Sequence, residues 1–257
     1  MAPLLHLPRS VHLAAWLPHV RGSASVAEHA VAGVQGDDEP HTTADGGAGL
    51  PDGPLADLVR AWGVPGVQAA AVLPVPGDVV GVPPEVSNGA VDAGECVLVA
   101  LGDEHFAAVP EVTPFGSPVE PGNLVRWRTC RVSPWTLGVV ATVGSLADAE
   151  RDLREALRTA TEALDSLDVA RWRDDAVEAL AWMRAEPDTS AFPRGLEPRR
   201  ARVLALAARL RRIVDLATAD DGGAVNLWQA DQRTAALRHV DHAARRAMCA
   251  ATLVVGA

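Results

Sequence analysis

Six side chains that could take part in acid–base chemistry lie between residues 104 and 131. The acids and the imidazole follow a predicted hairpin turn at Gly102-Asp103, and the arginines lie on a predicted neighbouring strand. The six residues are Glu104, His105, Glu111, Arg126, Arg128 and Arg131. A carboxylate, a histidine and an arginine could serve acid–base chemistry on a small anion if folding brings them together. The pattern favours a plainer arrangement, in which acids keep a turn soluble and arginines line a strand edge.

A second cluster of charge places six arginines among residues 199–212, without an acid. On a helix these arginines would flank an apolar stripe on both sides instead of forming one basic face. The formal net charge of the whole chain is −10, which opposes the approach of a polyanion. We therefore expect arginines that are solvated or paired with carboxylates, and no nucleic-acid partner.

Two histidines at helical spacing, His239 and His242, could face one metal ion. Their neighbours oppose this, because Arg238 and Arg245 lie on the same side and Asp241 can pair with Arg245. The chain also lacks the glycine-rich phosphate-binding patterns GxxxxGK and GxGxxG, and the nucleophile pattern GxSxG. We predict no metal site and no cofactor, and no catalytic residue can be assigned beyond the weak candidates Glu104, His105 and Glu111.

The three cysteines, Cys96, Cys130 and Cys249, are widely spaced and form no CxxC pair. This excludes a disulfide framework and gives no zinc pattern. The first twenty residues lack the basic start and the continuous apolar run of a signal peptide, and no apolar run reaches 18 residues. We expect a soluble cytoplasmic protein without membrane contact.

The composition of the chain changes at Ser145. Sixteen of the 19 prolines and 18 of the 22 glycines come before it, whereas 17 of the 23 arginines come after it. The excess of acids belongs to the first part. Turns and short strands are therefore expected before Ser145, and long helices after it.

The first part is predicted to contain helices and a small sheet. Two short helices cover 10–33, the second opened by a capping box at Ser25 and Glu28. Residues 37–53 are interpreted as a loop or linker, and 55–62 as an amphipathic helix. Strands are expected at 68–73, 96–101, 105–112 and 124–132, with Pro110 placing its strand at an edge or bending it.

Four amphipathic helices are predicted after Ser145, at about 146–167, 169–185, 198–219 and 225–253. The last has an alanine-rich face that would let another helix approach closely, and its proposed contact residues are Ala243, Ala244, Ala247 and Ala251. The fold class is therefore α+β, with a small mixed or antiparallel sheet and a C-terminal helical layer. The expected regions are 1–53, 54–144 and 145–257, the last of which could pack on the sheet as one domain.

The segments LPVPGDVVGVPPE and EVTPFGSP, followed by helices rich in arginine and alanine, resemble an uncharacterised protein family of G+C-rich actinobacteria. The resemblance implies no activity and no site residue. We expect a non-catalytic interaction or regulatory protein, with self-association through the alanine-rich helix as one form of that role. The alternative is an enzyme or small-anion-binding protein with a pocket formed by Arg126, Arg128 and His105. The sequence leaves open whether the chain is an enzyme.

Overall fold

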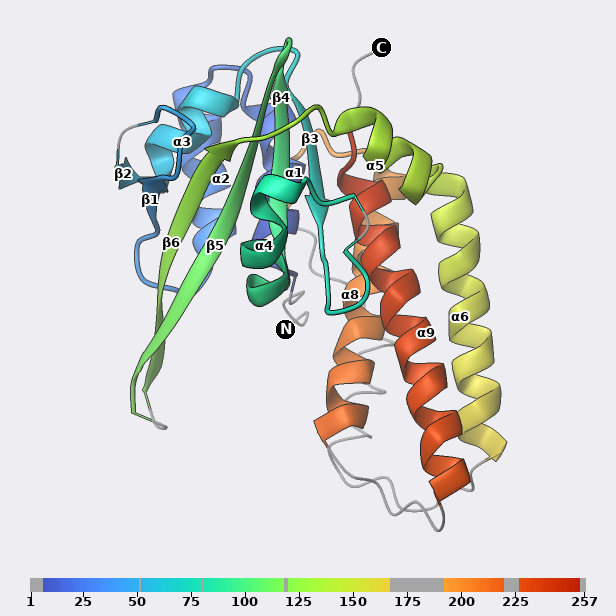
Figure 1. The fold of residues 1–257 in the computed structure, drawn as a ribbon. Coiled ribbons are helices and arrows are strands. Elements are labelled where there is room, and N and C mark those ends of the chain that lie inside the picture. The colour runs from blue at the N-terminus through green and yellow to red at the C-terminus, as the bar shows by residue number, and fades with distance from the viewer. Residues whose placement is uncertain are drawn as a thin grey trace. The chain divides into compact units, whose positions relative to one another are not determined.

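The computed structural model describes residues 7–50, 52–79, 81–117, 120–166, 192–219 and 227–254 (Figure 1). The chain divides into two compact units. The sheet unit comprises the described residues of 7–144, 192–197 and 252–254, and the helical unit those of 145–166, 198–219 and 227–251. The sheet unit is therefore built from three separate stretches of the sequence.

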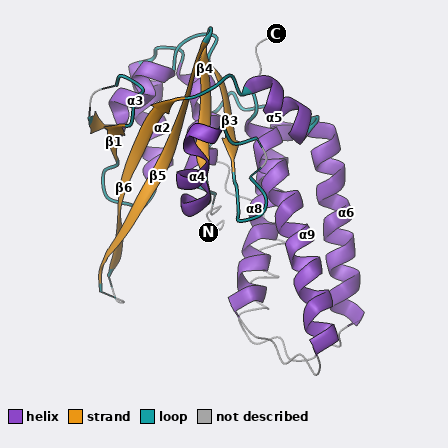
Figure 2. Cartoon of the chain, viewed as in Figure 1, coloured by secondary structure: helices purple, strands orange, loops and turns teal. Residues whose placement is uncertain are grey.

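The sheet unit is organised around one mixed six-stranded sheet (Figure 2). In spatial order its strands are β2 (Gly53–Pro54), β1 (Thr42–Asp45), β6 (Pro121–Arg131), β5 (Glu104–Gly116), β4 (Cys96–Leu101) and β3 (Gln68–Val72). Every neighbouring pair is antiparallel except β1 with β6, which is parallel. The α+β class and the mixed sheet predicted from the sequence are thus confirmed.

The predicted hairpin between β4 and β5 is present. Leu101 pairs with Glu104 across a two-residue turn, and Gly102 adopts a φ of 61° that favours glycine. Pro110 lies within β5, which is an interior strand, but the pairing of β4 with β5 ends at Ala108. Pro110 therefore lies past the end of β4, where its missing N–H removes no ladder hydrogen bond.

Helices cover both faces of the sheet. On one face, α1 (Arg9–Val20) lies against β3, β4 and β5, with α2 (Ala24–Gln35) and α3 (Leu55–Trp62) beside it. Trp62 of α3 stacks on Phe106 of β5, with ring centroids 5.8 Å apart. On the other face, the short η1 (Pro84–Val86) and α4 (Ser87–Ala93) pack near β5, and α5 (Thr136–Val143) follows β6 in the chain. Sandwiching by helices explains why strands β3 and β4 are almost continuously apolar.

Two local predictions in the first part differ from the structure. The N-cap of α2 is Ser23, whose hydroxyl accepts the N–H of Val26, and the predicted cap Ser25 lies inside the helix. Residues 37–53, interpreted as a loop or linker, contain β1 and β2. The strand β2 pairs with β1, and β1 in turn pairs with β6, which is remote in sequence. No local periodicity could therefore reveal these short strands.

The loop between β1 and β2 is organised by one carboxylate. Asp45 accepts hydrogen bonds from the N–H groups of Gly47 at 2.9 Å and Gly49 at 3.0 Å. These backbone bonds, that of Gly47 foremost, hold the pKa of Asp45 below its usual value. The glycine-rich composition of this segment therefore marks an ordered turn.

The helical unit contains α6 (Leu146–Ser166), α8 (Pro198–Ala219) and α9, which runs over Leu227–Thr252. These three helices match the predicted ones closely, and the predicted helix at 169–185 lies outside the described residues. Leu153, Leu204 and Met248 are among the largest fully buried side chains, so an apolar core lies between the helices. Among the described helices, none is both long and apolar enough to cross a membrane.

Candidate functional site

The six residues singled out between Glu104 and Arg131 lie on the β5–β6 ribbon but do not converge. The pairing register places His105, Glu111, Arg126 and Arg128 on one face and the remaining two, Glu104 and Arg131, on the other. Arg128 is opposite Val109, four residues from His105, which corresponds to about 13 Å along a strand. The side chains proposed for a pocket are therefore separated along the ribbon.

Each arginine of the ribbon is paired with a carboxylate. Arg131 Nη1 lies 2.6 Å from Glu104 Oε1, and Arg128 Nε lies 2.8 Å from Glu111 Oε1. Arg126 Nη2 lies 3.3 Å from Asp52 Oδ2 in the loop before β2. All of these side chains are largely exposed, so each pair contributes at most about 1 kcal/mol to stability. The pairs form a surface ladder in which the arginine charges are already neutralised.

His105 contacts an aromatic ring instead of an acid. Its ring meets that of Trp135 edge to face at a centroid distance of 6.3 Å, and the Trp135 indole N–H donates to the carbonyl of Val99. His105 Nδ1 is buried without a hydrogen-bond partner. A general base normally needs a group that orients its ring, and no described contact supplies one for His105.

Two of the three cysteines, Cys130 and Cys249, are unsuited to act as nucleophiles. Burial, together with the negative charge of Glu85, raises the pKa of the half-buried Cys130 thiol. Burial raises the pKa of the Cys249 thiol to about 12. A thiol must lose its proton to attack a substrate, so both groups are unreactive at neutral pH.

A buried aspartate–histidine–tryptophan chain is the arrangement in the sheet unit that most resembles catalytic machinery. His41 Nε2 lies 3.2 Å from Asp38 Oδ2, and the indole N–H of Trp127 lies 3.2 Å from His41 Nδ1. Because an indole nitrogen can only donate, His41 Nδ1 must be unprotonated and Nε2 must carry the proton given to Asp38. Both imidazole nitrogens are therefore engaged, and none remains for a substrate.

Asp38 joins this chain to the start of α1 and to β6. It accepts from Arg9 Nε at 2.6 Å and from Asn123 Nδ2 at 2.9 Å. Burial alone would raise the pKa of Asp38, but the hydrogen bonds from Arg9 and Asn123 outweigh it and the pKa is lowered. The cluster ties three elements together, which is a structural role. No sequence signal indicated it, because Trp127 is 86 residues from His41.

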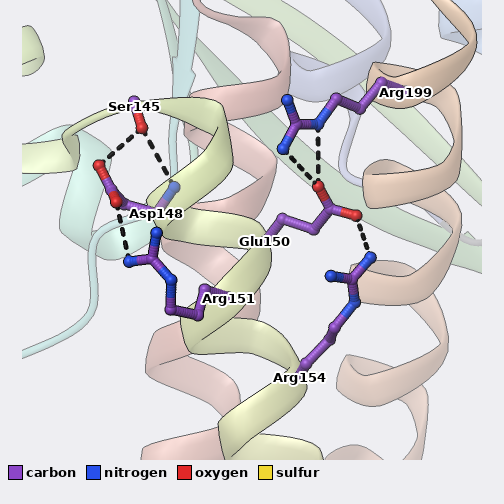
Figure 3. Close-up of polar contacts among 6 residues, drawn as sticks. All are labelled: Ser145, Asp148, Glu150, Arg151, Arg154 and Arg199. Atoms are coloured by element: carbon purple, nitrogen blue, oxygen red, sulfur yellow. Dashed lines mark hydrogen bonds and ion pairs between the residues drawn. The ribbon is translucent and has the colours of Figure 1, made fainter.

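In the helical unit, polar contacts join the first turns of α6 and α8 (Figure 3). Ser145 Oγ accepts the N–H of Asp148 and donates to its carboxylate, so Ser145 caps the N-terminus of α6. Glu150 of α6 pairs with Arg154 of the same helix and with Arg199 of α8, the latter at 2.8 Å. The hydrogen bond from Arg199 is the main cause of the lowered pKa of Glu150.

The next arginine of the run caps another helix. Arg200 Nη1 donates to the carbonyl oxygens of Ala251 at 2.9 Å and Ala250 at 3.3 Å, near the C-terminus of α9. The last carbonyls of a helix lack intrahelical partners, and a cation there is favoured by the helix dipole. Arg199 and Arg200 thus connect α8 to both other described helices of the unit.

Arg200→Met is expected to lower the free energy of unfolding of the helical unit by about 2 kcal/mol, because two buried carbonyls lose a charged donor. Arg212→Met, at an exposed position of the same helix, should change it by less than about 0.5 kcal/mol. Urea unfolding followed by far-UV circular dichroism measures both. Equal effects would contradict a capping role for Arg200.

The two histidines of α9 are not part of a metal cluster in the described residues. No group of three His, Cys, Asp or Glu side chains suited to a metal ion occurs there. Asp241, between the two histidines, accepts from Arg245 Nε at 2.7 Å and lies 3.4 Å from Arg211 Nε. These cations leave its carboxylate committed to ion pairing.

The four alanines proposed as an interface, Ala243, Ala244, Ala247 and Ala251, are at most 4% exposed. They are covered within the chain itself, so a second copy could reach them only if the packing of α9 opened. The small side chains serve close packing inside the molecule.

Comparison with protein families assigns both parts of the chain. Residues 10–140 match the family described as "Rv1486c-like protein, N-terminal domain", and residues 147–249 match "Rv1486c-like protein, C-terminal domain". The chain belongs to the Rv1486c-like family. This supports the expected uncharacterised actinobacterial family, and the family descriptions name no activity. No curated protein and no solved structure matched the chain.

The two Rv1486c-like domains correspond closely to the two units. The C-terminal domain, 147–249, begins and ends within two residues of the 145–251 span of the helical unit, but it also contains residues 192–197 of the sheet unit. The N-terminal domain, 10–140, omits residues 192–197 and 252–254, which complete the sheet unit.

Large exposed apolar side chains occur at the end of the β5–β6 ribbon in this Rv1486c-like protein. Phe115 is 45% exposed, Leu124 is 52% exposed and Val112 is 41% exposed. We call residues 111–116 and 121–125 the arm. The register places Phe115 and Leu124 on the same face of the arm as diagonal neighbours. Sequence analysis missed this surface because alternating apolar residues in a strand normally predict a covered face.

Proposed function

We propose that this chain is a non-catalytic interaction protein that contacts its partner through the arm. The observation that carries the proposal is the exposure of Phe115 and Leu124 on one face of the β5–β6 ribbon. Every residue of 111–117 is exposed. Aromatic and aliphatic anchors of this kind dominate the binding energy of protein interfaces.

The geometry of the arm makes it a formed binding element. Two-stranded ribbons are only marginally stable in water without a covering layer. Here the Phe115 ring lies against Gly122 on the opposite strand, where an added Cβ would approach Phe115 Cζ to 2.6 Å. The absence of a side chain at Gly122 therefore leaves room for the Phe115 ring to pack against the backbone of the opposite strand.

We propose a different protein as the partner, rather than a second copy. The two half-exposed apolar side chains on this face, Phe115 and Leu124, offer on the order of 200 Å² of surface. A stable dimer buries about 800 Å² on each side, so the arm alone is too small for a symmetric interface. An anchor inserted into a pocket of a partner requires less area. The polar rim of this contact surface would be formed by Glu111, Arg126 and Arg128, which carry charges of both signs.

The chemistry of the candidate catalytic groups supports a binding role over the small-anion pocket. His41 has both nitrogens engaged, and the raised pKa values of Cys130 and Cys249 keep these thiols protonated. Arg126 and Arg128, expected to hold an anion, are paired with carboxylates and lie far from His105 along the ribbon.

We further propose a cytoplasmic location and no nucleic-acid partner. Free Cys96, Cys130 and Cys249 suit a reducing compartment. In the arginine-rich run, Arg199, Arg200 and Arg211 bind groups of the protein itself, which reduces the positive charge available to a polyanion.

The test introduces a photo-crosslinking amino acid at Phe115 in the full-length protein, within cells of its source. A matched control carries it at Leu137 of α5, which is 85% exposed. We expect one discrete protein adduct from position 115 and none from 137. The identified partner is then purified, and the double variant Phe115→Ser, Leu124→Ser should bind it at least tenfold more weakly than wild type.

Leu137→Ser should bind the purified partner as wild type does, and both variants should unfold at the wild-type temperature. Adducts shared by both positions, no adduct at position 115, or undiminished affinity of the double variant would refute the arm as the contact surface.

A further inference from the structure

The sheet has two edges, and they are protected in different ways. The β2 edge is only two residues long and contains Pro54, which cannot donate a ladder hydrogen bond. The β3 edge has the sequence QAAAV, without charge, proline or bulge. Such an edge is a template for pairing with another chain unless something covers it.

Residues 252–254 cover the β3 edge. The N–H of Val254 donates to the carbonyl of Ala69 at 3.0 Å, in an antiparallel bridge. The N–H of Ala71 donates to the hydroxyl of Thr252 at 3.0 Å. Thr252 and Leu253 are buried, as are the alanines of β3. These contacts show that Ala69 and Ala71 direct their backbone groups outward from the sheet.

The same backbone groups would suit a second copy of β3. If two β3 strands meet antiparallel about a two-fold axis at Ala70, Ala69 of one copy lies opposite Ala71 of the other. Each such pair can exchange both of its backbone hydrogen bonds. Gln68 then faces Val72, and small alanine side chains fill the centre, so neither charge nor bulk opposes the contact. The edge is therefore self-complementary.

We infer that Thr252, the last residue of α9, and the two residues after it keep a second copy of the chain off the β3 edge. We call these three residues the guard strand, after the β-bridge that Val254 makes. Displacing this segment opens β3 to antiparallel pairing with β3 of another molecule. The contact is separate from the arm, so this inference stands independently of the proposed partner. The bridge made by Val254 is an isolated one outside the six paired strands, so the guard strand can be displaced without dismantling the sheet.

The test uses the full-length double variant Thr252→Val, Val254→Pro, which removes the hydroxyl acceptor and the N–H donor of the guard strand. Thr252→Ser keeps the hydroxyl and is the matched control. Sedimentation equilibrium should show an association constant for dimerisation that is at least tenfold higher for the double variant than for wild type. The association constant of Thr252→Ser should equal that of wild type. Adding Gln68→Lys to the double variant should reverse the increase, because a charged edge residue opposes strand pairing.

A wild-type dimerisation constant for the double variant, or a dimer that persists with Gln68→Lys, would overturn the inference. Circular dichroism is recorded in parallel. If the double variant is unfolded, Val254→Pro alone is measured in its place, with the same expected rise. Unfolding of that single variant would also overturn the inference, because the segment would then be part of the core instead of a removable guard.

Discussion

Gly63→Ala is expected to destabilise the sheet unit by about 2 to 3 kcal/mol. An added Cβ at Gly63 would lie 2.5 Å from both the Cβ of Val20 and the carbonyl oxygen of Val59. Both neighbours are buried, in α1 and α3, and one contact is with the backbone, which cannot move aside easily. The φ of Gly63 is −79°, so the effect is steric and independent of backbone preference. Equilibrium unfolding in urea measures it.

Gly138→Ala is the matched control for this effect. Gly138 lies inside α5, is exposed, and has no other atom within 4 Å of an added Cβ. Alanine is more favourable than glycine in the interior of a helix, so Gly138→Ala should raise the free energy of unfolding by about 0.5 to 1 kcal/mol. Two changes of the same kind are thus expected to have opposite signs. A neutral result for Gly63→Ala would contradict the close packing of α3 against α1.

Acid is expected to weaken the sheet unit through His12, a buried residue of α1. Burial lowers the pKa of His12 from 6.5 to about 4, because the charged form loses its hydration. The unfolded chain takes up this proton near pH 6.5, whereas the folded one does so only near pH 4. The contribution of His12 to the free energy of unfolding is therefore fully present above pH 6.5. It decreases by about 3 kcal/mol in total as the pH falls from 6.5 to 4.

His12→Leu isolates this contribution. The free energy of unfolding of the variant, minus that of wild type, should rise by about 3 kcal/mol in the variant's favour between pH 7 and pH 4. Urea unfolding at several pH values measures it. Parallel pH profiles for the two proteins would show that His12 does not titrate as its burial implies. His41 contributes with the same sign, since burial also lowers its pKa, although Asp38 opposes this.

The helices could be predicted well because their signals are local. The apolar spacing after Ser145 predicted helices at 146–167 and 198–219, and the structure has α6 at Leu146–Ser166 and α8 at Pro198–Ala219. The β4–β5 hairpin was equally local, set by Gly102 and its neighbours. In each of these cases the residues that determine the structure lie within a few positions of one another.

Non-local pairing explains most of what was missed. The strand β1 exists because Thr42 pairs with Arg126, and the guard strand because Val254 pairs with Ala69. Neither segment has an alternation of apolar and polar residues that would predict a strand from sequence. The prediction for the candidate site had the same weakness. It placed His105 and Arg128 on neighbouring strands, as observed, but only the register shows that they are four residues apart along the ribbon.

The covering of β3 by residues 252–254 has a consequence for the synthesis of the protein. A ribosome that has just translated Gly144 must add more than a hundred further residues before this covering exists. At about 5 to 20 amino acids per second, this interval for about 110 residues lasts roughly 5 to 20 s. Throughout it, a nascent sheet displays the exposed backbone of QAAAV next to other growing chains on the same messenger RNA. Chaperone binding during elongation is therefore most valuable to this protein in that interval.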